Sequence, residues 1–177
     1  MTGKTHLATG ILTGEAVILA TNQISMPAAL FAVSIAAIGS LLPDIDHPQS
    51  MLSTASFSTR AISSSISAVT KHRGFTHTPV FLICIVMIVN YLMDGKVAYS
   101  PLLTLSLCAG MLSHLLLDTL NEKGIMWLWP LWKRPLHLAC VRTRSKAENV
   151  LCIPINIAAT GCLIYIMYLY ILQVIHL

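Results

Sequence analysis

Two short stretches of this sequence carry acids and imidazoles at spacings suited to holding a divalent cation. His114 and Asp118 are four residues apart in SHLLLD, so on a helix both side chains leave the same face about one turn apart. Asp44 and Asp46 are two residues apart in LLPDID, and an extended backbone after Pro43 would send both carboxylates to the same side. We therefore expect each pair to reach one ion.

Three further histidines extend this candidate set. His72 and His77 lie on either side of Gly74 in HRGFTHTP, and the glycine permits a tight turn that brings both imidazoles inward. His6 precedes most of the first apolar segment. Imidazole and carboxylate together suit zinc, manganese or iron, and zinc is the ion that we expect first. The predicted ligands of one or two such ions are His6, Asp44, Asp46, His72, His77, His114 and Asp118.

The chemistry expected of such a site is hydrolysis. An ionised side chain isolated within a membrane bundle costs about 3 kcal/mol, and a bound cation removes that cost. The cation also makes a bound water acidic enough to be a nucleophile near neutral pH. A carboxylate that the metal leaves free, Asp46 or Asp118, would then serve as the base. Arg73 is shaped to clamp a phosphate through two hydrogen bonds, although an arginine at this position can equally anchor the end of a membrane segment.

The composition indicates which solvent surrounds the elements that carry these residues. Hydrophobic residues make up 55% of the 177 residues, charged residues make up 10%, and the mean hydropathy is +0.74. Since a soluble domain has about 25% charged residues, we expect lipid to surround this chain. We expect no nucleic-acid partner, because the basic residues follow the ends of apolar segments rather than lining one face.

Apolar segments predict an all-α fold, a polytopic helical bundle in the membrane with about five transmembrane or membrane-embedded helices. The segments are roughly residues 7–22, 26–42, 79–93, 98–120 and 150–172. Because about 20 apolar residues span a bilayer as a helix, the last two are long enough, and each of the first three could be a tilted or partial span. We predict a single integral membrane domain over residues 1–177, divided into a motif-bearing core at 1–120, an interfacial loop at 121–149 and a C-terminal span at 150–177.

The positions of Lys and Arg predict the orientation, because cytoplasmic loops near helix ends hold an excess of them. With the N-terminus inside and five crossings, every Lys and Arg except Lys96 lies on the inner side. The same arrangement places all the candidate ligands at the cytoplasmic end of the bundle, although their positions were not used to derive it. It also places the C-terminus on the outer side of the membrane.

Two connecting loops carry signals of their own. Apolar residues recur at helical intervals in residues 51–70, which predicts either an amphipathic helix on the membrane surface or a solvated serine-rich linker. All three tryptophans lie in residues 127–134 beside a Lys-Arg pair, which is typical of a loop at the level of the lipid headgroups, with stacking on a substrate as the alternative. The five cysteines have no CxxC spacing, which argues against a structural zinc knuckle.

Four motifs carry a resemblance to a known bacterial family. They are TH at residues 5–6, LLPDIDHP at 41–48, HRGFTHTP at 72–79 and SHLLLD at 113–118. As a set they resemble the YdjM-like, LexA-regulated, membrane-bound metal-dependent hydrolases over most of residues 1–120, with a remoter similarity to zinc-dependent phospholipase C. The resemblance implies a multi-pass inner-membrane protein, in which the outer side predicted for the C-terminus would be the periplasm. It favours a metal set with His6 nearby, and the family name suggests induction in the SOS response. The members of that set are Asp44, Asp46, His72, His77, His114 and Asp118. Thr78 departs from the family, where serine is more frequent, but the hydroxyl is kept.

The function that we predict is hydrolysis of a phosphoester or related bond in a lipid or lipid-linked substrate at the cytoplasmic leaflet. The alternatives are a divalent-metal transporter and a metal-stapled structural or sensor membrane protein. A transporter needs polar ligands near the middle of the bilayer. Apart from Glu15 and Asn90, the polar candidates of this sequence lie at one end of the apolar segments, which favours the hydrolase.

Overall fold

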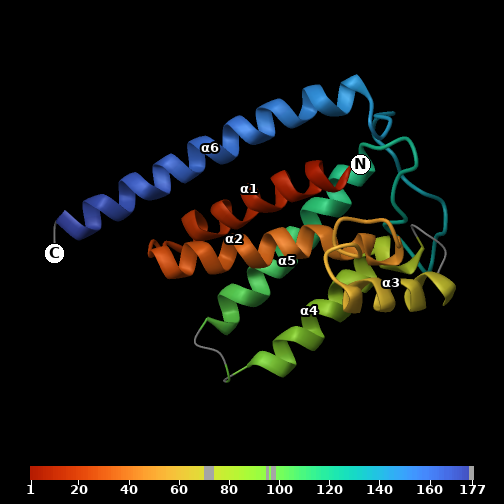
Figure 1. Ribbon diagram of the computed structural model, residues 1–177, viewed down its shortest axis with the longest axis horizontal. Coiled ribbons are helices and arrows are strands. Elements are labelled where there is room, and N and C mark those ends of the chain that lie inside the picture. Colours follow the sequence, from red (N-terminus) through yellow and green to blue (C-terminus); the bar gives the residue numbers. More distant parts are fainter. Residues whose placement is uncertain (70–73, 95, 97–98, 176–177) are drawn as a thin grey trace.

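The computed structural model describes residues 1–69, 74–94, 96 and 99–175, and this part of the chain is helical (Figure 1). The elements in chain order are α1 (Gly3–Thr21), α2 (Met26–Leu41), the 3-10 helix η1 (Leu42–Asp46), α3 (Phe57–Val69), the 3-10 helix η2 (Phe75–His77), α4 (Pro79–Met93), α5 (Ser100–Thr119) and α6 (Lys146–Ile175). Within the described residues the only strand-like pairing is two isolated bridges, Asn121 with Val141 and Ile125 with Leu136. The all-α prediction is therefore confirmed.

Each of the five predicted apolar segments falls on a helix, namely α1, α2, α4, α5 and α6. Three stretches of the described chain are long and apolar enough to cross a membrane, Met26–Asp46, Ser100–Thr119 and Lys146–Ile175, and α4 is a shorter apolar helix. Local signals set two of the starts. The Ser25 and Thr78 side chains accept hydrogen bonds from backbone N–H groups of the following turns, and a proline occupies the first turn of each helix.

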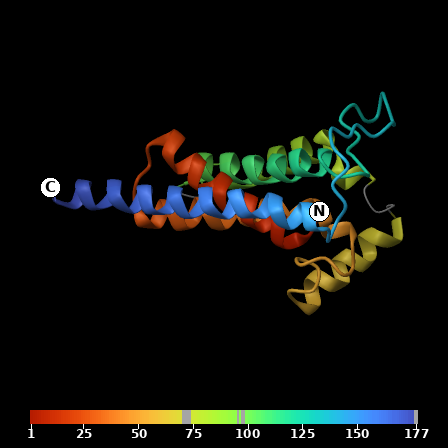
Figure 2. The same ribbon diagram turned by 90° about the horizontal axis from the view of Figure 1, so that it is seen from above.

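The centre of the bundle consists of α1, α2 and α5, which pack against one another, while α4 packs against α5 and α6 packs against α1 (Figures 1 and 2). Glycines allow these helices to approach closely. A Cβ atom on Gly39 of α2 would lie 2.8 Å from the carbonyl oxygen of Leu107 in α5. A Cβ atom on Gly14 of α1 would lie 2.6 Å from the Cα atom of Val33 in α2. Such backbone contact is typical of helices that associate in lipid.

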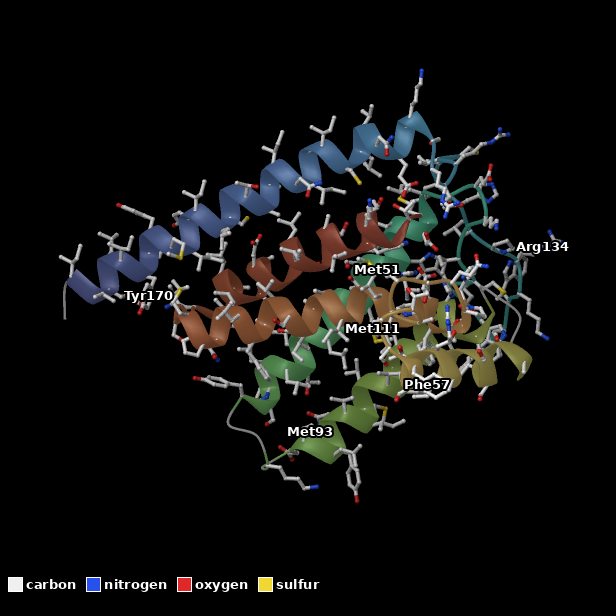
Figure 3. All side chains as sticks on the ribbon, viewed as in Figure 1. Met51, Phe57, Met93, Met111, Arg134 and Tyr170 are labelled. Carbon is white, nitrogen blue, oxygen red and sulfur yellow. The ribbon has the colours of Figure 1, made fainter. Side chains whose placement is uncertain are left out.

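The two ends of the molecule differ in what they carry. The start of α1, α3 and the loop after α5 lie at one end, and the C-terminal part of α6 projects at the other (Figures 1 and 2). Arg134 and Tyr170 mark these opposite ends in Figure 3. Apolar side chains of α6 such as Ile157 and Ile164 are exposed, as expected of a helix that faces lipid. The predicted orientation of these ends across the membrane stays a prediction.

The segment 51–70 contains the predicted helix, which is α3, preceded by a series of turns. Phe57 and Ile62 of α3 are exposed, and Phe57 retains 88% of its accessible surface. An aromatic side chain left so bare is consistent with a helix that rests on a lipid surface, and that placement stays a prediction.

Candidate metal centre

Five of the predicted ligands come together at the end of the bundle where α1 begins. They are His6 of α1, Asp44 of η1, His77 of η2, and His114 and Asp118 of α5. The three imidazoles and Asp118 are buried, whereas Asp44 is partly exposed. Four separate elements therefore supply one cluster.

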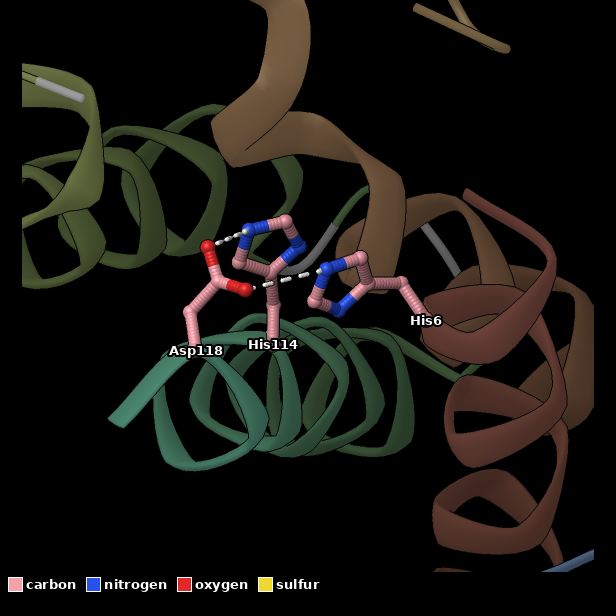
Figure 4. Close-up of side chains that lie close together, drawn as sticks. All are labelled: His6, His114 and Asp118. Carbon is pink, nitrogen blue, oxygen red and sulfur yellow. Dashed lines mark ion pairs between the residues drawn. The ribbon is translucent and has the colours of Figure 1, made fainter. Parts of the chain in front are cut away.

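The first group consists of His6, His114 and Asp118 (Figure 4). The α5 pair has the predicted geometry, with His114 Nε2 at 3.8 Å from Asp118 Oδ2. His6 Nε2 lies 3.4 Å from the other carboxylate oxygen, Asp118 Oδ1, and the His6 ring stacks on the His114 ring with 3.7 Å between centroids. The close packing of α1 and α5 thus brings the His6 imidazole against the face of α5 that carries His114 and Asp118.

The second group consists of Asp44, His77 and His114, and it shares His114 with the first. Asp44 Oδ1 lies 3.2 Å from His77 Nε2 and 3.9 Å from His114 Nε2. His77 Nε2 also lies 4.0 Å from Asp118 Oδ2, which joins the two groups. Ligand atoms of a tetrahedral zinc site stand about 3.4 Å from one another when each is about 2.1 Å from the ion. The separations given above, 3.2–4.0 Å, lie near or somewhat above that value.

The tautomer of His114 follows from its outer contact. Its Nδ1 lies 2.7 Å from the backbone carbonyl oxygen of Ser40, which can only accept, so Nδ1 carries the proton. The lone pair of Nε2 then faces the carboxylates. Nε2 is buried and makes no hydrogen bond to the described residues. A buried polar atom without such a partner is costly, and a cation would satisfy it.

The tautomer of His77 is set by a chain of two hydrogen bonds. Thr76 Oγ1 donates to Asp46 Oδ2 at 2.9 Å, which uses the single hydroxyl proton. Thr76 Oγ1 therefore accepts from His77 Nδ1 at 3.1 Å. His77 Nε2 lies 3.2 Å from Asp44 Oδ1, where a bound cation would take the place of the proton that this hydrogen bond needs. Both imidazoles thus turn Nε2 toward the cluster while their outer nitrogens are held, as in metal-bound histidines.

The expected extended backbone after Pro43 is wrong. Residues Leu42–Asp46 form η1, a 3-10 helix that continues directly from α2. Because such a helix has about three residues per turn, side chains two positions apart point in different directions. Asp44 faces the imidazole Nε2 atoms, whereas Asp46 is buried beside Thr76, 3.9 Å from the outer nitrogen of His77. Asp46 belongs to neither group of candidate ligands among the described residues, and its predicted role stays a prediction.

Two of the predicted site residues, His72 and Arg73, lie outside the described residues, so their predicted roles stay predictions. The structure adds two residues that the sequence interpretation did not include, Ser40 and Thr76, which orient His114 and His77. Thr76 had a signal, since it is a hydroxyl residue directly before a candidate ligand. The Ser40 contact involves a backbone carbonyl, which no side-chain pattern reveals. The amino group of Met1 also reaches the cluster, at 2.5 Å from Asp118 Oδ1.

A cavity of about 470 Å³ adjoins the cluster through Asp44. It is lined by the start of the chain, by the segment after η1 and by the loop after α5, through Met1, Thr2, Gly3, Asp44, His47, Gln49, Ser50, Met51, Lys123, Thr143 and Arg144. His47 belongs to the wall of the cavity, and its Nδ1 accepts from the Gln49 backbone N–H at 3.1 Å. The partly exposed carboxylate of Asp44 is therefore where the buried cluster meets solvent.

The chain is similar in sequence to one protein family and to several of its relatives. The family model described as "YdjM inner membrane protein" matches residues 1–176. YvsG of Bacillus subtilis (strain 168) is 32% identical over 160 residues, which are 90% of this chain and 92% of that protein. The inner membrane protein YdjM of Escherichia coli (strain K12) is 33% identical over 114 residues, which are 63% of this chain and 56% of that protein. No solved structure matches the chain.

Proposed function

This chain belongs to the family of YdjM inner membrane proteins, and we propose that it is a membrane-bound metal-dependent hydrolase acting on a phosphoester or related bond of a lipid or lipid-linked substrate. The observation that carries the proposal is the convergence of buried imidazoles and carboxylates beside a cavity. A divalent cation held there, zinc first and manganese or iron as alternatives, would supply an acidified water near neutral pH.

The described residues have distinct roles in this proposal. The side chains of His6, Asp44, His77, His114 and Asp118 would hold the ion. Asp118 has one oxygen near His6 and the other near His77 and His114. One oxygen can therefore hold the ion, and we assign the oxygen left free as the proton acceptor predicted for Asp46 or Asp118. Asp46, through Thr76, would keep the outer nitrogen of His77 protonated. Arg73 keeps its proposed task of clamping a phosphate.

A lipid or lipid-linked substrate at the cytoplasmic leaflet is supported by the surroundings of the cluster. The loop after α5 is tied to this end of the bundle, because the Trp127 indole N–H donates to Thr119 Oγ1 at 2.8 Å. The Arg134 guanidinium lies 5.6 Å from the centre of the Trp132 ring in the same loop. Tryptophan and arginine together are typical of the headgroup level. A cytoplasmic N-terminus and a periplasmic C-terminus belong to the same proposal.

The alternative of a metal transporter would need further ligands along a path through the bundle. The two described groups of candidate ligands lie at one end, and the next acid along α1, Glu15, is nine residues or about 13 Å of helix rise beyond His6. The alternative of a structural metal staple predicts a closed site. A cavity that reaches Asp44 favours the hydrolase over both.

The experiment that tests the proposal is metal analysis of protein purified in detergent. We expect the wild-type chain to carry a divalent ion that is lost in His114→Ala and Asp44→Ala. The matched control is His137→Ala, because His137 is exposed in the loop after α5. We also expect a chelator to abolish hydrolysis of a chromogenic phosphodiester and zinc to restore it. Equal metal content in the wild type and both site variants would remove the basis of the proposal.

A further inference from the structure

We propose that the cavity beside Asp44 is an anion site that binds a phosphoryl group through Lys123 and Arg144. The inference rests on the proposed function in one respect, that the bound phosphoryl group is part of the substrate. It goes beyond that function because it names the side chains that recognise the substrate and the chemical class that they recognise. The cavity has about 470 Å³, which is within the range of about 300–1,000 Å³ for small-molecule sites.

The charges of the cavity wall favour an anion. Lys123 and Arg144 bring two positive charges to it, and Asp44 brings one negative charge. The wall therefore keeps one net positive charge even when no cation is bound at the cluster. Lysine binds phosphate as a compact point charge, whereas the planar guanidinium of arginine can donate two parallel hydrogen bonds. Both side chains come from the loop after α5.

A buried amide fixes two parts of this wall. Asn121 is 1% exposed, and its Oδ1 accepts from the backbone N–H of Lys123 at 3.1 Å. Its Nδ2 donates to Thr143 Oγ1 at 2.9 Å. Because the oxygen of Thr143 already accepts from the amide, the hydroxyl proton is left to donate to a ligand. Asn121 thus positions the backbone of Lys123 and the hydroxyl group of Thr143 at the same cavity.

A buried acid, Glu148, holds the backbone of Arg144, the third residue of this part of the cavity wall. Glu148 of α6 is 1% exposed, and its Oε2 accepts from the backbone N–H of Arg144 at 2.6 Å. Its Oε1 accepts from the backbone N–H of Thr2 at 2.5 Å and from Thr5 Oγ1 at 2.7 Å. The Glu148 side chain therefore joins the position of Arg144 to the first turn of α1, which carries His6.

The backbone of Arg144 adds a second sign that its position is specified. Its φ angle is +63°, a left-handed conformation that is uncommon for residues other than glycine, asparagine and aspartate. Such conformations persist where surrounding contacts hold them, and they gather at functional sites. The hydrogen bond from its N–H to the buried carboxylate of Glu148 is the contact that holds this one.

The test measures orthophosphate binding by calorimetry to the full chain in detergent after the metal has been removed with a chelator. We expect Lys123→Ala and Arg144→Gly each to weaken binding about tenfold. Glycine is chosen because it adopts a positive φ without strain. The matched control is Lys133→Ala, which removes an exposed positive charge outside the cavity wall and should leave the affinity unchanged. Equal orthophosphate affinity of the wild type and of a variant that carries both Lys123→Ala and Arg144→Gly, with unchanged thermal stability, would overturn the proposal.

Two further arms separate the source of the phosphoryl group and the two proposals. The lipid arm uses the protein in nanodiscs. If phosphatidate competes with orthophosphate and phosphatidylcholine does not, the site binds a lipid headgroup. Competition by neither lipid assigns it to a soluble phosphate. Because binding is measured without metal, wild-type protein that binds orthophosphate but no divalent ion would uphold the anion site and overturn the hydrolase. Protein that binds the ion but not orthophosphate would do the reverse.

Discussion

The same three helices build an apolar region at one end of the bundle and a polar region at the other. Away from the cluster, α1, α2 and α5 contribute side chains such as Ile18, Ala32 and Leu102 to a buried apolar core. Where α1 begins, the corresponding faces carry His6 and His114. One set of helix contacts therefore serves two purposes, because packing at the apolar region sets the distances between ligands at the polar region. Substitutions in the two regions should separate these purposes.

The largest effect is expected from Asp118→Asn, which keeps the shape of the side chain but removes its charge. Because Asp118 is assigned both as a ligand and as the proton acceptor, metal-dependent hydrolysis should fall by about 100-fold or more. The measurement is the turnover of a chromogenic phosphodiester with zinc added. Ser106→Ala is the control on the same helix, since Ser106 is equally buried but lies two turns from His114. If both variants lose turnover, any substitution of a buried polar residue in α5 abolishes activity. The proposed difference between the polar and the apolar region would then be wrong.

The next effect tests whether Thr76 acts through His77. Thr76→Val removes the hydroxyl that accepts from His77 Nδ1 and donates to Asp46. Outer contacts of this kind change metal affinity by about 10-fold to 100-fold, so we expect a loss within that range in a zinc titration. Thr76→Ser keeps the hydroxyl and should restore the affinity. Equal affinity in Thr76→Val and wild type would contradict the chain of hydrogen bonds.

A smaller effect is expected from Glu148→Gln, which replaces one acceptor oxygen with an NH₂ group that faces backbone or hydroxyl donors. Loss of the hydrogen bond should make the free energy of orthophosphate binding about 1 kcal/mol less favourable, which weakens binding about fivefold. Glu122→Gln is the matched control, because Glu122 is exposed and pairs with Arg142 at the surface. If both variants bind orthophosphate alike, Glu148 does not position Arg144.

The smallest effect is expected in the apolar region. Ile18→Val removes one buried methylene group and should lower the free energy of unfolding by about 0.5–1.5 kcal/mol. Metal content at saturating zinc should be unchanged, because the region is remote from the ligands. Denaturant titration in micelles gives the first quantity and metal analysis gives the second. A loss of metal at saturating zinc would show that the two regions are not separable.

The sequence predicted the helices well because their signals are local. A run of apolar residues specifies a membrane helix without reference to the rest of the chain, and five such runs correspond to α1, α2, α4, α5 and α6. The pair His114 and Asp118 could be predicted for the same reason, since a four-residue spacing on a helix sets its own geometry.

The remaining parts of the site depend on contacts between distant residues. The directions of Asp44 and Asp46 depend on η1, whose residues pack against α3 and η2. The tautomer of His77 depends on Asp46, thirty positions before Thr76. Glu148 has the appearance of an ordinary acid in the first turn of a helix, and only its contacts with Thr2 and Thr5 reveal that it is buried. Such pairings leave no mark in a single sequence.

The order in which the ligands occur along the chain has a consequence for biosynthesis. His6 of α1 leaves the ribosome before the intervening helices, and its partners His114 and Asp118 follow only with α5. The complete set of side chains could therefore capture an ion only after four apolar helices have entered the bilayer, so metal loading of the proposed site would be a late event in the maturation of the nascent polypeptide.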